Sequence, residues 1–199
     1  MTNDNNYIAH KLTEWEKYLG NHSLPAWEQL PAIGLYMDQV VELLTQYLDF
    51  LIIDDKEDKV VTASAINNYV RMKIMPAPHK KKYSRVHIAY LIMICTLKQS
   101  LNIAYVQKMI PMDVSEQEFQ ELYSNYVERH KASSDYFIEE LRTIAKRTLF
   151  TEDINHNTVR NLIYSSAVIS GYSRLLTEEL VKLQRNEDAD DIGRVGEKR

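Results

Sequence analysis

The sequence has few residues that break helices and almost no cysteine. Its 199 residues include five glycines, five prolines and one cysteine, Cys95. So few glycines and prolines favour long uninterrupted helices over a turn-rich β-sandwich. A lone cysteine excludes an internal disulfide and a cysteine-rich metal site. Its apolar neighbours Leu91, Ile92 and Ile94 indicate a core thiol rather than a nucleophile.

The chain also lacks the apolar runs that secretion and membrane insertion require. The N-terminal segment Met1–Asn6 is polar and has no basic region followed by an apolar core, as a secretory signal would have. The longest apolar run, Ile88–Leu97, is far shorter than the ~20 residues that cross a bilayer. We therefore expect a cytoplasmic protein that does not enter a membrane.

Signatures of catalysis and cofactor binding are missing from the sequence as well. There is no Gly-x-Gly-x-x-Gly, no Walker loop and no Gly-x-Ser-x-Gly nucleophile elbow. The six histidines form no His-x-x-x-His pair or Glu-x-x-His repeat, so we expect no metal site. His87 and His130 are interpreted as partly buried structural residues. The sequence thus predicts neither an enzyme nor a bound cofactor.

Negative charge is absent from one part of the chain, residues 60–110. This span contains no Asp or Glu but eight Lys or Arg residues. Because the whole chain has a net charge of −4, the remainder carries −12. A surface that binds a polyanion excludes carboxylates, since they repel phosphates. The span therefore predicts a nucleic-acid-binding region, and a chance cluster of charge is the alternative.

Caps, apolar spacing and prolines define the elements of this basic span and its flanks. Thr62 is the predicted N-cap of a short helix, which ends before Pro76 and Pro78. The lysines of residues 79–83 then form an exposed arm. The apolar spacing predicts four helices, over residues 34–51, 62–72, 84–99 and 102–110.

Longer helices are expected on either side, where acidic residues return. A first helix covers Tyr7–Leu19, and Ser115 with Glu118 forms a capping box that begins a helix reaching about Leu149. The tail from residue 187 has a composition typical of disorder. The last helix carries a stripe with the four- and three-residue steps of a coiled coil: Leu162, Ser166, Ile169, Ser173, Leu176, Leu180 and Leu183.

The order of elements is that of a DNA-binding helix-turn-helix followed by a wing. Helix 62–72 would enter the major groove, and the arm 79–83 would follow the phosphate backbone. Asn67 and Asn68 can make bidentate contacts to adenine, while Arg71 can read guanine or bind a phosphate. The residues predicted to contact DNA are Thr62, Ser64, Asn67, Asn68, Tyr69, Arg71, Lys73, Lys80, Lys81, Lys82, Tyr83 and Arg85.

Two stretches resemble a bacterial family known as domain of unknown function 1836. Residues 62–71 are similar to its pattern Thr-x-x-Met-Ile-Asn-Asn-Tyr-Val-Lys, and residues 81–91 to Lys-Lys-Tyr-Ser-Arg-Glu-His-x-Ala-Tyr-Leu. The departures, Ala65 and Val86, leave the predicted contact residues in place. The resemblance covers about residues 30–135.

A more distant resemblance is to the MerR-type regulators. The stretches over residues 66–76 and 83–85 and the helix from Asn102 are similar to the recognition helix, wing and following helix of that family. The resemblance implies an all-α fold: a MerR-like winged helix-turn-helix followed by long C-terminal helices, with a short β-hairpin as one form of the wing. Asn67 and Asn68 replace an Arg-Tyr pair of that family, so promoter specificity is not implied. The metal-binding cysteines of its metal-sensing members are missing too.

Together these features predict four parts and a regulatory function. The parts are an N-terminal helix and connector (1–33), the winged helix-turn-helix (34–111), a C-terminal helical hairpin for dimerisation or sensing (112–186) and a disordered tail (187–199). The predicted function is a sequence-specific transcriptional regulator that binds double-stranded DNA as a homodimer through its C-terminal helices.

Two other functions remain open at this point. One is a protein–protein adaptor whose basic face docks an acidic partner without binding DNA, because a fold by itself does not assign a function. The other is compatible with DNA binding: the C-terminal helices would bind a small-molecule effector. The aromatic residues that could line such a pocket are Tyr123, Tyr126, Tyr136, Phe137, Tyr164 and Tyr172.

Overall fold

A computed structural model describes residues 2–52, 60–149 and 156–196, and within them the chain is mainly helical, as predicted. No strand forms in these residues, only the isolated bridges Leu35–Tyr83 and His79–Lys82. In chain order the elements are α1 (Thr2–Gly20), the short 3-10 helix η1 (Trp27–Gln29), α2 (Met37–Tyr47), η2 (Asp49–Leu51), α3 (Ala63–Arg71), α4 (Arg85–Leu97), α5 (Ile103–Met109), α6 (Glu116–Leu149) and α7 (His156–Gly196).

The helix starts depend on local caps, of which the sequence predicted those at Thr62 and Ser115. The Thr62 hydroxyl accepts a hydrogen bond from Ala65 N at 3.2 Å, and Asn102 Oδ1 accepts from Ala104 N at 3.1 Å. At the start of α6, Ser115 N donates to Glu118 Oε2 at 2.8 Å, which confirms the capping box. Because these contacts lie within one turn, the residues that make them define each helix start directly.

Helix α4 is the centre of the core. Ile88, Leu91, Ile92 and Cys95 lie at helical spacing on one face of α4, but nine consecutive residues, His87 to Cys95, are buried. The reason is that α2, α5 and α6 all contact α4, so every side of it is covered. A helix that is apolar all round is stable only when it is enclosed in this way.

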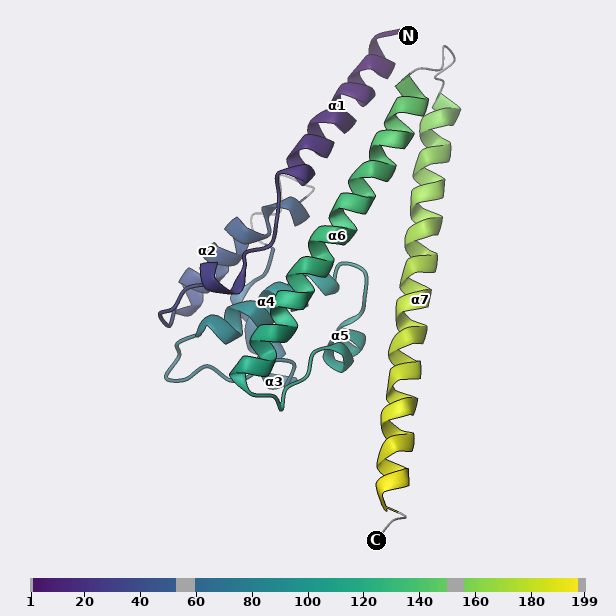
Figure 1. Cartoon of the computed structure of the whole chain (residues 1–199). Coiled ribbons are helices and arrows are strands. Elements are labelled where there is room, and N and C mark those ends of the chain that lie inside the picture. Colours follow the sequence, from purple (N-terminus) through teal and green to yellow (C-terminus); the bar gives the residue numbers. More distant parts are fainter. Residues whose placement is uncertain (1, 53–59, 150–155, 197–199) are drawn as a thin grey trace.

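Helix α6 packs along α1, and the two lie side by side (Figure 1). Trp15 of α1 meets Phe137 of α6 edge-on, with ring centroids 5.9 Å apart, and Arg142 Nε lies 2.6 Å from Glu16 Oε1. Helix α7 contacts α5, and α6 makes its long contact with the first helix of the chain.

Helix α7 also extends further than the composition suggested. It continues to Gly196, past residue 187, where a disordered tail was expected; residues 197–199 lie outside the described part. No proline interrupts the chain between residues 187 and 196, so the backbone keeps its hydrogen bonds despite the polar composition. Among the described helices, none combines the length and the apolar character that crossing a membrane requires.

Tyr123 joins α6 to the connector that precedes η1. The side chain is fully buried, and its hydroxyl donates a hydrogen bond to the Pro25 carbonyl at 2.8 Å. Burial raises the pKa of Tyr123, so the hydroxyl keeps the proton that it donates.

Replacing Tyr123 with Phe should lower the free energy of unfolding by about 1–2 kcal/mol, because the Pro25 carbonyl loses its partner inside the protein. Urea denaturation followed by circular dichroism measures the change. Tyr136→Phe is the matched control, because the Tyr136 side chain is 71% exposed. Removing its hydroxyl should change the free energy of unfolding by less than about 0.5 kcal/mol. Equal effects of the two substitutions would contradict the role of Tyr123.

Candidate nucleic-acid interface

Helix α3 has one buried face and one polar face. Ile66 is fully buried and Tyr69 is 6% exposed. On the other side, four polar residues follow the i, i+3, i+4, i+7 spacing that places side chains on one face of a helix: Ser64, Asn67, Asn68 and Arg71. We call these four residues the α3 face. A short helix anchored by two apolar side chains thus presents a polar row outward.

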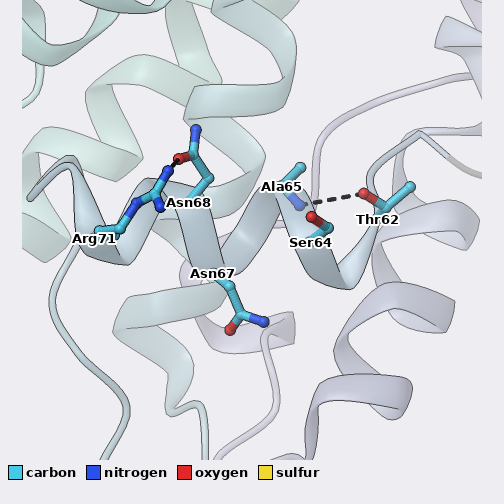
Figure 2. Close-up of a pocket in the computed structure, with 6 residues that line it drawn as sticks. All are labelled: Thr62, Ser64, Ala65, Asn67, Asn68 and Arg71. Atoms are coloured by element: carbon cyan, nitrogen blue, oxygen red, sulfur yellow. Dashed lines mark hydrogen bonds between the residues drawn. The ribbon is translucent and has the colours of Figure 1, made fainter.

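The α3 face lines an open hollow of about 500 Å³, together with Thr62 and Ala65. Figure 2 shows Asn68 and Arg71 turned toward each other, with Arg71 Nη2 donating to Asn68 Oδ1 at 2.7 Å. Asn67 points away from this pair. Its amide has no hydrogen bond partner among the described residues. An amide that is exposed and unpaired is free to hydrogen-bond a ligand at both its oxygen and its nitrogen.

The end of α3 carries a lysine in an unusual backbone conformation. Lys73 has a φ of 55°. It lies in a Schellman motif, in which Ile74 N donates to Tyr69 O at 3.0 Å and Lys73 N donates to Val70 O at 3.0 Å. Glycine is the usual residue at this position because it has no Cβ. Here Ile74 is buried and secures the motif, and the lysine side chain is exposed.

The arm over residues 79–83 is a tight turn rather than an extended segment. Lys82 N donates to His79 O at 2.9 Å, and the two central residues, Lys80 and Lys81, have φ values of 49° and 63°. Two positive φ values are characteristic of a type I′ turn, which reverses the chain between paired residues. We call residues 79–82 the lysine turn; it takes the place of the β-hairpin that the family resemblance implied.

Two contacts attach the lysine turn to the core. Tyr83 is buried and exchanges backbone hydrogen bonds with Leu35, at 2.8 and 2.9 Å. On the other side, His87 Nδ1 accepts a hydrogen bond from Ser84 N at 3.0 Å. Its Nε2 lies 3.2 Å from the Ala77 carbonyl, so the neutral tautomer with the proton on Nε2 satisfies both partners.

The structure turns several predicted DNA contacts toward the protein. Arg85 Nε donates to the Leu30 carbonyl at 3.1 Å, and its guanidinium lies 5.8 Å from the Trp27 ring centre. Tyr69 and Tyr83 are buried in the core. Burial raises the pKa of Tyr69, which the nearby Lys98 partly offsets. Tyr69 and Tyr83 therefore face the core, whereas Arg85 is half-buried.

Eight of the predicted residues remain exposed, and two of these contact another side chain. The ammonium of Lys82 lies 5.5 Å from the Tyr36 ring centre. Arg71 is bound to Asn68, a predicted residue that is itself half-buried. The other six exposed residues are Thr62, Ser64, Asn67, Lys73, Lys80 and Lys81.

Two residues help to position the interface in ways that the sequence did not predict. Gln107 of α5 donates from Nε2 to the Met72 carbonyl at 3.1 Å, which ties α5 to the end of α3. His87 occupies the third position of α4, where a capping box has Glu or Gln. This position, three residues after the N-cap Ser84, was the one signal in the sequence that could have identified the role of His87.

The described residues contain no cluster of three or more His, Cys, Asp or Glu side chains that could hold a metal ion. Cys95 is fully buried, and burial raises the pKa of its thiol to about 12. A thiol with this pKa stays protonated at neutral pH, and the thiolate is the reactive form.

These features define a mainly helical protein that presents a polar, carboxylate-free surface on α3 and the lysine turn. The chain belongs to the family described as "Domain of unknown function (DUF1836)", whose model matches residues 25–128, just over half of the chain. The match covers α2 to α5 and the first part of α6. No curated protein and no solved structure matches the chain.

Acidification should destabilise the protein through His87. Burial lowers the pKa of His87 below its ordinary value of 6.5. Below about pH 6.5 the unfolded chain therefore binds more protons than the folded one, so stability is complete above this pH and declines as the pH falls. Urea denaturation at pH 7 and pH 5 measures the loss. His87→Gln should reduce it, because glutamine keeps the capping-box bond to Ser84 N but does not titrate.

The exposed His10 supplies the control for this prediction. Its side chain is 70% exposed, so His10→Gln should leave the difference in stability between pH 7 and pH 5 unchanged. Burial also lowers the pKa of His130, with a contribution from the charge of His22, and His130→Gln should account for a further part of the loss. A pH dependence that is the same in His87→Gln and in the unaltered protein would contradict the assignment.

Proposed function

We propose that the protein is a sequence-specific DNA-binding regulator of transcription, in which α3 reads bases in the major groove and the lysine turn contacts the phosphate backbone. The observation that carries the proposal is the α3 face itself. It is a row of exposed amide, hydroxyl and guanidinium groups on a short helix, inside a 51-residue span, residues 60–110, without a single carboxylate.

The chemistry of the α3 face suits base recognition. Asn67 carries a donor and an acceptor that match the N6 and N7 edge of adenine, and Arg71 matches guanine. The amide of Asn68 already bonds Arg71 and Met72. The Asn68–Arg71 hydrogen bond holds the guanidinium in place before binding. Ser64 is exposed near the N-terminus of α3, where its hydroxyl and the backbone amides of the helix suit a phosphate.

The three lysines with positive φ support phosphate binding. Lys73, Lys80 and Lys81 are the three non-glycine residues of the described chain with positive φ, and all three are exposed. A side chain in this conformation costs about 1 kcal/mol relative to glycine. What lysine adds at these positions is a positive charge, and backbone strain of this kind is often found at functional sites.

The lysine turn provides a test that separates binding from stability. We expect Lys80→Gly/Lys81→Gly to have equal or higher thermal stability, because glycine adopts positive φ without strain. Its affinity for duplex DNA should nevertheless fall. The plot of log affinity against log salt should become shallower by about 0.9 for each phosphate that the variant no longer neutralises. Fluorescence anisotropy with a labelled duplex, at several salt concentrations, measures both.

Two other variants complete this experiment. Lys11→Gln/Lys17→Gln removes the same charge from exposed positions on α1 and should leave the salt slope unchanged. Asn67→Ala should instead reduce the preference for a sequence selected from a random duplex library over an unselected one, by about 1–3 kcal/mol. Binding that is absent at low salt, or insensitive to salt, would contradict the proposal. Co-purification of an acidic protein without DNA binding would favour the adaptor function.

We further propose that the regulator is a homodimer paired through α7. Val181 is buried on α7, which contacts α5, but eight large apolar side chains on the opposite side are 52–70% exposed. We call them the α7 stripe: Tyr164, Val168, Ile169, Tyr172, Leu175, Leu176, Leu180 and Leu183. A monomer rarely exposes so continuous an apolar surface.

A second copy of the chain is the occupant that this stripe fits. Ile169, Tyr172, Leu176, Leu180 and Leu183 follow the three- and four-residue steps of a coiled-coil seam. If each side chain buries on the order of 100 Å², the eight together match the ~800 Å² of surface that each partner buries in a stable interface. Two copies would also present two α3 faces, as dimeric readers of paired half-sites do.

Ile169→Glu/Leu176→Glu should convert the dimer into a monomer, because each substitution would bury carboxylates in the apolar seam. Sedimentation equilibrium measures the mass. Ile163→Glu is the matched control, since Ile163 is 60% exposed on α7 but lies outside the stripe, and this variant should stay dimeric. An unaltered protein that sediments as a monomer at micromolar concentration would refute the pairing.

A further inference from the structure

A second candidate site lies away from the α3 face, in a cavity of about 340 Å³ between α1, η2 and α6. We call it the α1–α6 cavity. It combines aromatic side chains from three elements with polar side chains, and its volume is within the range of sites for small organic molecules. Neither the proposed DNA contacts nor the α7 stripe uses the residues that line it.

The apolar part of the cavity consists of aromatic rings held in place by one another. Trp15 and Phe137 meet edge-on, and they remain 42% and 48% exposed. Phe50 of η2 lies between two imidazoles, with its ring centre 4.7 Å from that of His22 and 5.8 Å from that of His130. Rings arranged around an open space offer faces and edges to a planar aromatic ligand.

The free polar groups of the cavity are an imidazole and two hydroxyls, and each of them can donate a hydrogen bond. Its nearby carboxylate, Asp49, already binds His22, with Asp49 Oδ1 3.0 Å from His22 Nε2. The ring nitrogens of His130 and the hydroxyls of Ser133 and Ser134 have no hydrogen bond partner among the described residues. None of the described residues that line the cavity carries a carboxylate that could pair with a cationic ligand. A ligand carboxylate would find an imidazole N–H and two hydroxyl donors, and hydrogen bonds to an ionised acceptor are the stronger ones.

The surroundings of His130 favour its neutral imidazole. Burial, with a contribution from the charge of His22, lowers the pKa of His130. A carboxylate beside the ring would oppose both effects by favouring the protonated imidazole.

The cavity also adjoins the helix that supports α3. Phe50 belongs to η2, which continues directly from α2 through Leu48, a fully buried residue whose N–H donates to Leu44 O at 3.0 Å. Helix α2 in turn contacts α3 and α4. A ligand that packs against Phe50 therefore contacts η2, which is joined to α2, and α2 packs against α3.

We propose that the α1–α6 cavity binds a small aromatic carboxylate, with its ring among Trp15, Phe50 and Phe137 and its carboxylate accepting hydrogen bonds from His130, Ser133 and Ser134. Occupancy changes the affinity of the protein for DNA through Phe50 and α2. This second statement rests on the proposed function, whereas the binding site itself does not.

Isothermal titration calorimetry with 2-naphthoate tests the site without DNA. We expect saturable binding with one site per chain, weakened about tenfold or more in Phe137→Ala and in His130→Leu, because each removes a direct contact. 2-Naphthalenemethanol has the same ring but no charge, and it should bind about tenfold more weakly than 2-naphthoate. Tyr136→Ala changes an exposed neighbour of Phe137 and should bind as the unaltered protein does. Thermal melts establish that each variant is folded.

Three results would overturn the site. One is the absence of binding heat, and another is equal affinity for the acid and the alcohol. The third is loss of binding in Ile169→Glu/Leu176→Glu, which would place the probe on the α7 stripe. The regulatory step is tested separately by duplex titration with and without 2-naphthoate: the DNA affinity should change in the unaltered protein and stay constant in Phe137→Ala. If the protein binds 2-naphthoate as described but no DNA, the site stands and the DNA-binding function fails.

Discussion

The enclosure of α4 is the constraint on which the other elements depend. With nine consecutive residues buried, this helix needs a neighbour on every side, and α2, α5 and α6 supply them. Its first turn then holds the lysine turn through His87 and Ser84, and its last turn leads into α5. Tyr90 stacks on Phe119 of α6, with ring centres 3.9 Å apart, and bonds the Pro111 carbonyl at 2.7 Å. A change that loosened α4 would therefore disturb both the core and the candidate interface.

The candidate interface consists of two short segments, α3 and the lysine turn, that are rigidly attached to the core. Helix α3 has only nine residues, a length that is marginal for an isolated helix. It is held by two buried side chains, by the Thr62 cap and by the link from Gln107 to Met72. The lysine turn is equally short, and the Leu35–Tyr83 pairing secures it. Because both segments are fixed from behind, their outward side chains are displayed in defined positions, which a site for a rigid polymer such as duplex DNA requires.

Different surfaces serve the three activities that we propose. The DNA surface lies on α3 and the lysine turn, the dimer surface on the outer side of α7, and the ligand cavity between α1 and α6. Figure 1 shows α7 set apart from the pair formed by α1 and α6. Helix α2 and η2 connect the cavity to α3 by direct packing. Communication between sites in this arrangement would need only a small displacement of one packed helix, since packed interfaces shift between discrete arrangements.

Local chemistry made part of this structure predictable from the sequence alone. Thr62, Ser84, Asn102 and Ser115 determine where helices begin, because a cap acts within one turn of the chain. The prolines at 76 and 78 keep the segment after α3 from being helical, and the missing carboxylates mark the basic span. Only the tertiary structure decided which side chains face outward. Arg85, a predicted DNA contact, has its partners Trp27 and Leu30 more than fifty residues away in sequence and is half-buried against them. The partner of α6, the positive φ of three lysines and the cavity around Phe50 likewise depend on contacts between distant segments, which helical spacing does not encode.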